Sequence, residues 1–388
     1  MIIIDREKCC GCQACAQVCP KSCITMTADG EGFLYPVVDE GVCVQCGLCE
    51  KVCPVLHSTE KEQGEPRAYA AYNLEEDVRL ASSSGGVFTL LAEYVLEQDG
   101  IIYGAAMNGI QVTHVRVADR EGLDQLRGSK YVQSDIGRTY IQAKGDLDAG
   151  KTVLFTGTPC QIEGLKMFLR KDYETLITMD IICHGVPSPM VWEKYVALRE
   201  KEAGASALQT FFRHKKYGWK DFSMFLEFSN KTQHVYRHSE DVFMKAFLYD
   251  LCLRPSCYQC SFKKVNRVSD ITVADFWGID AVCPEMDDDR GTSLVMIHTE
   301  KGNRIFDAIS GKLRYQSVDF KEATRYNSAM TCSAAMPENR NVFMENVHAQ
   351  DLEVLVRKYA KDKLTVKDIV KKLLKKLGLL ELVKKLKK

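Results

Sequence analysis

Short apolar runs alternate with helical patterns along the middle of the chain. The strand-like runs are 67–73, 100–107, 152–156 and 176–183, and the helical patterns are 85–97, 161–169 and 190–199. Runs of four to eight apolar residues are typical of buried strands, and apolar residues recurring every three or four positions are typical of helices. This alternation predicts a mixed α/β body.

More strand-like runs follow with fewer helical patterns between them. They are 207–213, 222–228, 233–237, 271–276 and 293–299. We therefore expect the later part of the body to be richer in antiparallel strands. The fold class is predicted as α+β / α/β.

Cysteine is the one residue type whose abundance adds to this picture. The 388 residues hold 17 cysteines, an odd number that cannot all pair within the chain. The N-terminus lacks a secretory signal and no stretch is apolar enough to span a bilayer, so the thiols indicate metal or redox chemistry in a cytoplasmic protein. The net charge is zero, and it gives no indication of nucleic-acid binding.

Ten of the cysteines lie within residues 9–53, in an internal repeat of 34 residues. Both copies fit C-x2-C-x2-C-x3-C-P. In this pattern three cysteines wrap one [4Fe–4S] cluster and the fourth binds the other cluster. The expected ligand sets are Cys9, Cys12, Cys15 with Cys53, and Cys43, Cys46, Cys49 with Cys19. Residues 1–60 resemble the bacterial two-cluster ferredoxin family.

A pair of zinc sites is the alternative for this repeat. Zinc ribbons usually combine two C-x2-C pairs, whereas each run here has four cysteines and a closing proline. Cys10 and Cys23 fall outside the pattern. We expect Cys10 to be a packed thiol. The polar segment 56–66 that follows is predicted to be a linker.

Residues 145–152 match the P-loop pattern G-x4-G-K-[ST] literally. A phosphate-binding P-loop follows a strand and begins a helix. Here a helical pattern, 135–144, precedes the motif and a strand-like run follows it. The sequence therefore predicts a turn from helix to strand and no nucleotide triphosphate.

Three polar turns have ligand-binding character. Serines and glycines at 82–86 precede a helical pattern, where they suit either a simple helix cap or an anionic ligand. The turn 127–134 brings together a cation, hydroxyls, a phenol and an amide, and it suits a ligand or an ordinary surface loop. The stretch 156–161 follows a strand, at the kind of sheet edge where ligands gather in α/β proteins.

Four further cysteines have spacings that suit a third cluster. Cys160 and Cys183 follow successive predicted strands, and Cys257 and Cys260 form a C-x2-C pair. Spacing alone leaves two alternatives open. Lone cysteines at strand ends are common small core residues, and a C-x2-C pair also serves thiol–disulfide exchange.

Six motifs of the body occur in a specific order. They are Ser84-Gly85-Gly86, Gly128-Ser129-Lys130-Tyr131, Gly157-Thr158-Pro159-Cys160-Gln161, Cys183-His184-Gly185, Cys257-x2-Cys260 and Ala274-Asp275-Phe276-Trp277-Gly278. This order resembles the coenzyme F420 hydrogenase/dehydrogenase beta-subunit family over residues 66–330. The resemblance implies FAD, a body cluster held by cysteines, and an oxidoreductase activity.

Carried onto this sequence, the resemblance assigns roles to individual residues. The implied ligands of the body cluster are Cys160, Cys183, Cys257 and Cys260. The implied FAD site consists of Ser84, Gly85, Gly86, Ser129, Lys130, Tyr131, Gln133, Thr156, Gly157, Thr158, Pro159 and Gln161. His184 and Lys130 are the candidate catalytic residues, His184 as a hydrogen-bond or proton donor and Lys130 as a stabiliser of negative charge on the flavin.

The chain departs from hydrogenase subunits in two ways. It carries its own ferredoxin domain, and Asp275 is followed by Phe-Trp-Gly where Gly-Asp is expected in deazaflavin-using relatives. The expected substrate is thus coenzyme F420 or another small organic acceptor, in a setting such as surface-glycan synthesis. A redox partner protein or ferredoxin is the expected partner. The alternative function is a non-catalytic adaptor that passes electrons to a partner oxidoreductase.

The expected domains are 1–60, then a reductase body in two parts, 66–150 and 151–330, and a basic tail, 361–388. The tail carries a net charge of +8, with apolar residues at helical spacing and lysines between them. This pattern is typical of an interfacial helix at an anionic membrane surface. A helix that packs on a partner or on the chain's own acidic surface would show the same pattern.

Overall fold

The structure is a computed structural model that describes residues 5–57 and 64–361. The expected basic tail lies outside the described residues apart from Lys361, and so do residues 58–63 of the expected linker. Within the described ranges, no helix is long and apolar enough to cross a membrane.

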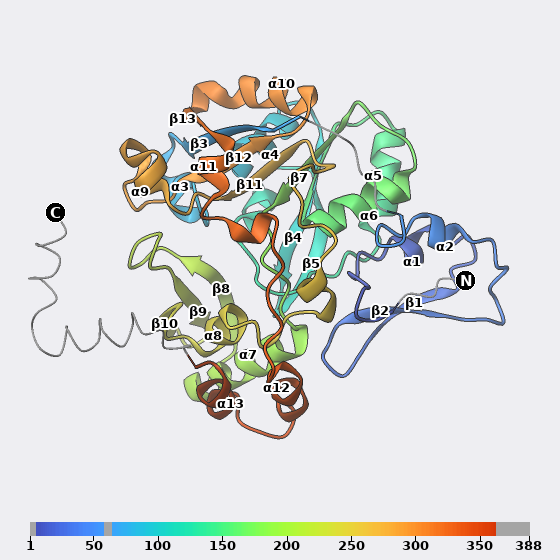
Figure 1. Cartoon of the computed structure of the whole chain (residues 1–388), viewed down its shortest axis with the longest axis vertical. Helices are drawn as coiled ribbons and strands as arrows, with labels where there is room; N and C mark the ends of the chain where they lie inside the picture. Colours follow the sequence, from blue (N-terminus) through green and yellow to red (C-terminus); the bar gives the residue numbers. More distant parts are fainter. Residues whose placement is uncertain (1–4, 58–63, 362–388) are drawn as a thin grey trace, which may run out of the picture.

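A mixed sheet of eight strands forms the centre of the molecule (Figure 1). Its order is β13-β3-β12-β11-β7-β6-β4-β5. The strands are β3 (Arg67–Asn73), β4 (Ile101–Asn108), β5 (Gln111–Val117), β6 (Val153–Gly157), β7 (Leu176–Ile181), β11 (Ile271–Asp275), β12 (Ser293–Ile297) and β13 (Leu313–Val318). The neighbours β4, β6, β7 and β11 run parallel, so their carboxyl ends meet at one edge.

Helices cover both faces of this sheet. Ile102 and Leu154, which are paired across β4 and β6, point to the face covered by α4 (Val87–Leu96) and α10 (Glu300–Ile309). Tyr103 and Phe155, one residue further on, point to the other face, where α5 (Thr139–Asp148) and α6 (Pro159–Leu169) pack. Burial on both faces explains why these strands are continuous apolar runs.

A smaller antiparallel sheet forms a second lobe, with strand order β10-β9-β8. Its strands are β8 (Ala207–His214), β9 (Ser223–Phe228) and β10 (Gln233–Arg237), and its helices are α7 (Pro189–Ala203), α8 (Val242–Leu248), α12 (Arg340–Asn346) and α13 (Leu352–Tyr359). Only these three of the later strands form a separate antiparallel sheet. β11 and β12 return to the central sheet instead.

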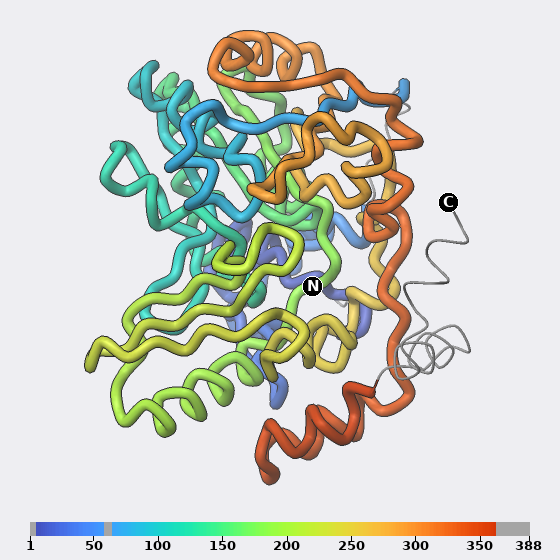
Figure 2. Tube along the Cα trace, turned by 90° about the vertical axis from the view of Figure 1, so that its left-hand side faces the viewer, coloured from blue at the N-terminus to red at the C-terminus, as the bar shows by residue number. Residues whose placement is uncertain are grey.

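The chain crosses from the central sheet to this lobe along one side of the molecule. After β13 it forms α11 (Phe320–Thr324), and it then runs down the edge to α12 (Figure 2). Two further short helices, α3 (Glu76–Ala81) and α9 (Ile279–Val282), lie at the far end of the sheet (Figure 1).

The N-terminal domain packs directly against the body. It consists of α1 (Ala14–Val18), the antiparallel hairpin of β1 (Ile24–Ala28) and β2 (Leu34–Val38), and α2 (Leu48–Lys51). Ala14 and Val52 belong to the same apolar cluster as Ile162 and Leu165 of α6. The two parts therefore share a continuous core beside α5 and α6 (Figure 1).

The tip of the β1–β2 hairpin reaches the second lobe. Arg340 of α12 forms a two-pronged ion pair with Glu31. Ser188 Oγ donates a hydrogen bond to the Glu31 carbonyl. A Cβ on Gly32 would lie 2.7 Å from the Met190 backbone nitrogen, so the hairpin lies against the start of α7.

The P-loop-like sequence forms the turn from helix to strand that its order predicted. Gly145 lies inside α5, which ends at Asp148, and β6 begins at Val153. The first glycine of the motif is therefore part of a helix. The motif is followed by a strand, and not by a helix N-terminus that could bind a phosphate.

Candidate iron–sulfur sites

The first ligand set predicted for the N-terminal domain surrounds one cavity. Cys9, Cys12, Cys15 and Cys53 line it together with Cys10. Its empty space is about 330 Å³, including the open mouth. The four predicted ligands are buried, each less than one-tenth exposed. The fourth cysteine comes from the second run, as the crossed ligand pattern requires.

The two cysteine runs have the same backbone shape. Gly11 and Gln13 adopt left-handed φ angles of 70° and 63° in the first run, and Gln45 and Gly47 adopt 53° and 72° in the second. These positions correspond across the repeat of 34 residues. Alternating left-handed residues curl each loop just before its short helix, and the third cysteine of each run, Cys15 or Cys49, lies in that helix.

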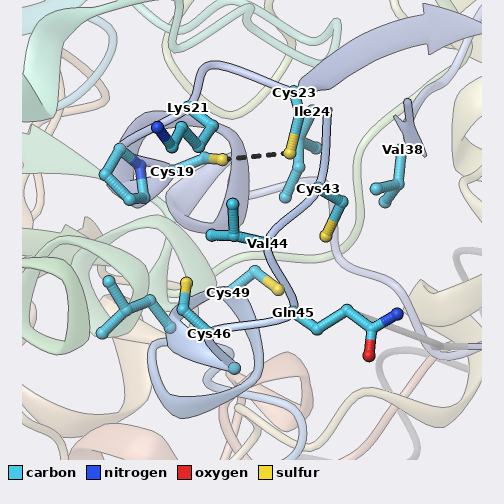
Figure 3. Close-up of a pocket in the computed structure, with 13 residues that line it drawn as sticks. Cys19, Lys21, Cys23, Ile24, Val38, Cys43, Val44, Gln45, Cys46 and Cys49 are labelled. Atoms are coloured by element: carbon cyan, nitrogen blue, oxygen red, sulfur yellow. Dashed lines mark hydrogen bonds between the residues drawn. The ribbon is translucent and has the colours of Figure 1, made fainter. Parts of the chain in front are cut away.

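The second ligand set surrounds a cavity closer to solvent (Figure 3). Cys19, Cys43, Cys46 and Cys49 line it together with Cys23, around an empty space of about 360 Å³ including the mouth. Cys46 is exposed, and the neighbouring Val44 is 57% exposed. This cavity is therefore the more exposed of the two in the dicluster domain.

Cys23 adds a fifth thiol to this cavity. Its Sγ lies 3.3 Å from Cys19 Sγ, and either sulfur can donate the hydrogen bond (Figure 3). This contact, together with burial, raises the pKa of Cys23 to about 12. Burial also acts to raise the pKa of Cys19, but hydrogen bonds from Cys23 and neighbouring amides outweigh it and lower that pKa. Cys19 therefore loses its proton more readily than Cys23.

Burial holds several of the other cysteines protonated unless a positive partner is present. It raises the pKa values of Cys15 and Cys183 to about 12, and it is also the largest cause of the raised pKa values of Cys53 and Cys260. A buried thiolate needs a counter-charge, and cluster iron supplies one. Within the described residues, no three His, Cys, Asp or Glu side chains converge on a point for a single metal ion.

A third cavity, with an empty space of about 1150 Å³ including its mouth, lies at the carboxyl edge of the parallel strands. Its lining includes the four cysteines that the resemblance assigns to the body cluster: Cys160, Cys183, Cys257 and Cys260. Cys160 lies in the first turn of α6, and Cys183 follows β7, the strand next to β6. The fold thus brings together thiols that are 100 residues apart in the sequence.

The third cavity and the first one share a wall. Cys10 and Val55 line both of them. Helix α6 approaches this wall closely, because a Cβ on Gly164 would lie 2.8 Å from Cys12 Cβ. Cys15 and Cys53 of the first set also pack in one cluster with Cys49 of the second set, so the first cavity adjoins both of the others.

The third cavity is also lined by basic and polar groups. His184 Nε2 lies 2.6 Å from Asp250 Oδ1, which fixes the imidazole. Lys263 Nζ donates to the carbonyls of Cys183 and His184, and so holds the loop after β7. Arg267 forms a buried ion pair with Asp180. His184 thus lines the cavity together with the body cysteines.

Two of the three predicted flavin-binding stretches contact each other through residues that do not line the third cavity. Ser129 N donates to Ser83 Oγ at 2.7 Å, which joins the 127–134 turn to the serine–glycine turn. The serines do not cap α4. Ser84 Oγ donates to the Thr292 carbonyl, and the cap residue is Gly86, with φ 81° and no side-chain hydrogen bond to the helix. The first-turn amides of α4 thus receive no side-chain cap, contrary to the simple-cap alternative.

The 127–134 turn extends to the third stretch at its other end. Ser134 Oγ accepts a hydrogen bond from Gln161 Nε2, and Gln161 Oε1 accepts one from Thr158 N. Gln133, Thr158, Pro159 and Gln161 line the third cavity. Lys130 Nζ instead donates to carbonyls of its own loop, those of Gln125 and Arg127. The two candidate catalytic residues, Lys130 and His184, therefore have different hydrogen-bond partners.

Several site residues were not assigned from the sequence. Cys10 and Cys23 line cavities beside predicted ligands, and Lys263 and Arg254 hold the surrounding loops. The cysteines carried a weak signal, since they lie next to or just after the ligand pattern. The basic residues carried none, because their partners are backbone carbonyls far away in the sequence.

Comparison with known proteins agrees with this geometry. Residues 8–56 match the family model of the 4Fe-4S dicluster domain, and residues 150–323 match the family model for the C terminus of the coenzyme F420 hydrogenase/dehydrogenase beta subunit. A chain of the xenon-derivatised F420-reducing [NiFe] hydrogenase complex from Methanosarcina barkeri is 17% identical. That similarity covers 75% of this chain and 97% of that chain, with a TM-score of 0.45. No curated protein matches the chain.

The chain is therefore an iron–sulfur redox protein. More narrowly, it joins a 4Fe-4S dicluster domain to a body similar to the beta subunits of coenzyme F420 hydrogenase/dehydrogenase. The resemblance expected from the order of the motifs is confirmed over residues 150–323, and the ferredoxin resemblance over residues 8–56.

Proposed function

We propose that the chain is a flavin-dependent oxidoreductase, which moves electrons between its dicluster domain and an FAD that reduces or oxidises a small organic substrate. One observation carries the proposal. The third cavity is lined by the four body cysteines together with four predicted flavin residues, Gln133, Thr158, Pro159 and Gln161. A flavin exchanges electron pairs with substrates and single electrons with iron–sulfur clusters, so the two groups belong in adjacent sites.

The chain's own residues suit an anionic flavin nucleotide. The first-turn amides of α4, without a side-chain cap, face the kind of position where phosphate binds. The Lys130 amine lies on the turn that contacts the same serine–glycine segment. His184, held by Asp250, is placed to hold or release a proton at the cavity wall.

Cofactor analysis of anaerobically purified protein tests this proposal. We expect about 12 iron and 12 sulfide per chain from three cubic clusters, together with about one FAD. Eight iron without flavin would contradict the assignment of the body and leave the dicluster domain standing.

The substrate is tested separately. We propose coenzyme F420 or another small organic acceptor, and the Asp275-Phe276-Trp277-Gly278 sequence favours the second. Reduced protein should then oxidise in the presence of the correct acceptor, observed as return of the flavin absorption. Bleaching of added F420 by reduced protein would identify F420 itself as the acceptor.

An adaptor without substrate chemistry is the second candidate. The exposed Cys46 and Val44 favour it, since they offer a docking face for a redox partner. Stoichiometric electron transfer to a partner protein, with no turnover of any small acceptor and no flavin, would favour the adaptor.

A further inference from the structure

Arg254 is a buried guanidinium at the boundary between the dicluster domain and the body. Its relative exposure is 0%. Its Nε donates to the Cys9 carbonyl at 2.7 Å, and its Nη2 donates to the Leu34 carbonyl at 3.0 Å. Both acceptors belong to the dicluster domain, whereas Arg254 belongs to the body, immediately before the Cys257–Cys260 pair.

The third arm of this guanidinium connects to the predicted flavin turn. Nη1 donates to Gln133 Oε1 at 2.8 Å, and Gln133 Nε2 donates to the Cys10 carbonyl at 3.2 Å. Gly11 lies tightly against both side chains, because a Cβ there would be 2.6 Å from Gln133 Nε2 and 2.8 Å from Arg254 Nη1. Arg254 and Gln133 thus clamp the backbone of the first cysteine loop.

The charge of Arg254 has no carboxylate partner among the described residues. Its acceptors are two carbonyls and an amide, and the Tyr35 ring lies 4.2 Å from its guanidinium carbon. Burial of an uncompensated charge is costly, so buried charges are normally paired. The other buried arginines near this boundary follow that rule, since Arg340 pairs with Glu31 and Arg267 with Asp180.

The missing negative charge is available from the cluster site itself. A cubic cluster with four thiolate ligands is anionic, and each reduction adds one further negative charge. We propose that Arg254 is the counter-charge of the cluster held by Cys9, Cys12, Cys15 and Cys53, and that it raises the reduction potential of that cluster. This inference rests on the dicluster assignment and is independent of the flavin.

Arg254 also bonds to the lining of the body site. Its Nη1 donates to Gln133, which lines the third cavity together with Cys160. Arg254 is therefore a positioning residue that contacts both the first cysteine loop and the wall of the third cavity.

Redox titration of three holoprotein variants, followed by electron paramagnetic resonance, tests the proposal. Arg254→Met removes the charge, Arg254→Lys keeps it, and Arg340→Met removes a buried guanidinium that has its own carboxylate. We expect Arg254→Met to make one cluster at least tenfold harder to reduce, about 59 mV for a one-electron couple. Arg254→Lys and Arg340→Met should stay within twofold of the wild-type equilibrium.

Iron content separates loss of charge from loss of the site. Loss of iron in Arg254→Met, together with full iron and a wild-type potential in Arg254→Lys, also supports the proposal. Unchanged potentials in an iron-replete Arg254→Met protein would overturn it. A low potential or missing iron in Arg254→Lys would overturn it too, since the fork of hydrogen bonds, and not the charge, would then be responsible. Eight iron in the wild type leaves this test valid and contradicts only the body cluster.

Discussion

At the scale of single residues, two cysteines of the body have different expected roles. Cys160 lines the third cavity, whereas Cys252 is fully buried in the core of the second lobe. We expect Cys160→Ser to lower the iron content from about 12 to about eight per chain, because the dicluster domain keeps its own ligands.

Cys252→Ser is the matched control for this substitution. It should keep all of its iron and lose only stability, since a hydroxyl replaces a core thiol. Iron analysis together with absorption spectra measures both variants. Twelve iron in Cys160→Ser would remove Cys160 from the ligand set.

Lys130 should make the free energy of unfolding of the flavin-free protein depend on pH in the alkaline range. Burial lowers its pKa to about 7 from an ordinary value of 10.5. Between these values the unfolded chain binds more protons than the folded one, so stability rises with pH. Below about 7 the cost of charging Lys130 in the folded state is fully present.

We therefore expect Lys130→Met to be stabilised relative to wild type at pH 7, with the difference shrinking as the pH rises toward about 10. Urea unfolding at several pH values measures this. A difference between the two proteins that does not change with pH would show that Lys130 does not titrate in this range.

The spacing of the cysteines predicted which thiols line the same cavity. Each run of Cys9–Cys19 and Cys43–Cys53 contributes three cysteines to one cavity and one to the other. The contacts of the serines at 82–84 could not be predicted in this way. Their hydroxyls bond to Val78 and Ser129, and to Thr292, which is more than 200 positions away. The contacts of Arg254 could not be predicted from the sequence either, because they include backbone carbonyls of another domain.

At the scale of elements, helix α6 packs closely against the first cysteine run. Gly164→Ala should weaken the cluster at Cys12, because the new methyl would lie 2.8 Å from Cys12 Cβ and the loop must move. We expect slower cluster assembly and faster loss of four iron, measured by chelator challenge.

Gly145→Ala in α5 is the control for this helix substitution. A Cβ at Gly145 meets nothing within 4 Å, so alanine should stabilise the helix by about 0.5–1 kcal/mol. Equal iron retention in the two variants would show that contact with α6 does not govern the first cluster.

Most central strands could be predicted because they are buried on both faces. β3 has the predicted boundaries, and β4, β6 and β7 lie within two residues of theirs. The edge strands β5 and β13 were missed. β13 is mostly exposed, with only Leu313 buried, and it therefore carries almost no apolar pattern. The hairpin of β1 and β2 was missed for a similar reason.

At the scale of the whole molecule, the two clusters of the dicluster domain should differ in their resistance to air. The second cavity contains the exposed Cys46, whereas all the ligands of the first are buried. Brief exposure to oxygen should therefore remove about four iron first from the Cys43 set. Mössbauer or paramagnetic resonance spectra taken over time would detect this order. Simultaneous loss of both clusters would contradict it.

The relation between domains could not be predicted from local patterns. The return of β11 and β12 to the central sheet, and the contact of α1 with α6, depend on pairs of residues that are far apart in the sequence. Apolar periodicity reports which side of an element is buried, and it does not report what covers that side.

The hairpin contact with α12 and α7 has a kinetic consequence. Glu31 is held by Arg340 and Ser188, so the dicluster domain is fastened to the body at a second point, away from the shared core. A carrier domain that had to swing between donor and acceptor would be slowed by viscous solvent. A domain held at two points does not need to move between donor and acceptor. Electron exchange within the chain should therefore proceed at the same rate in glycerol as in water.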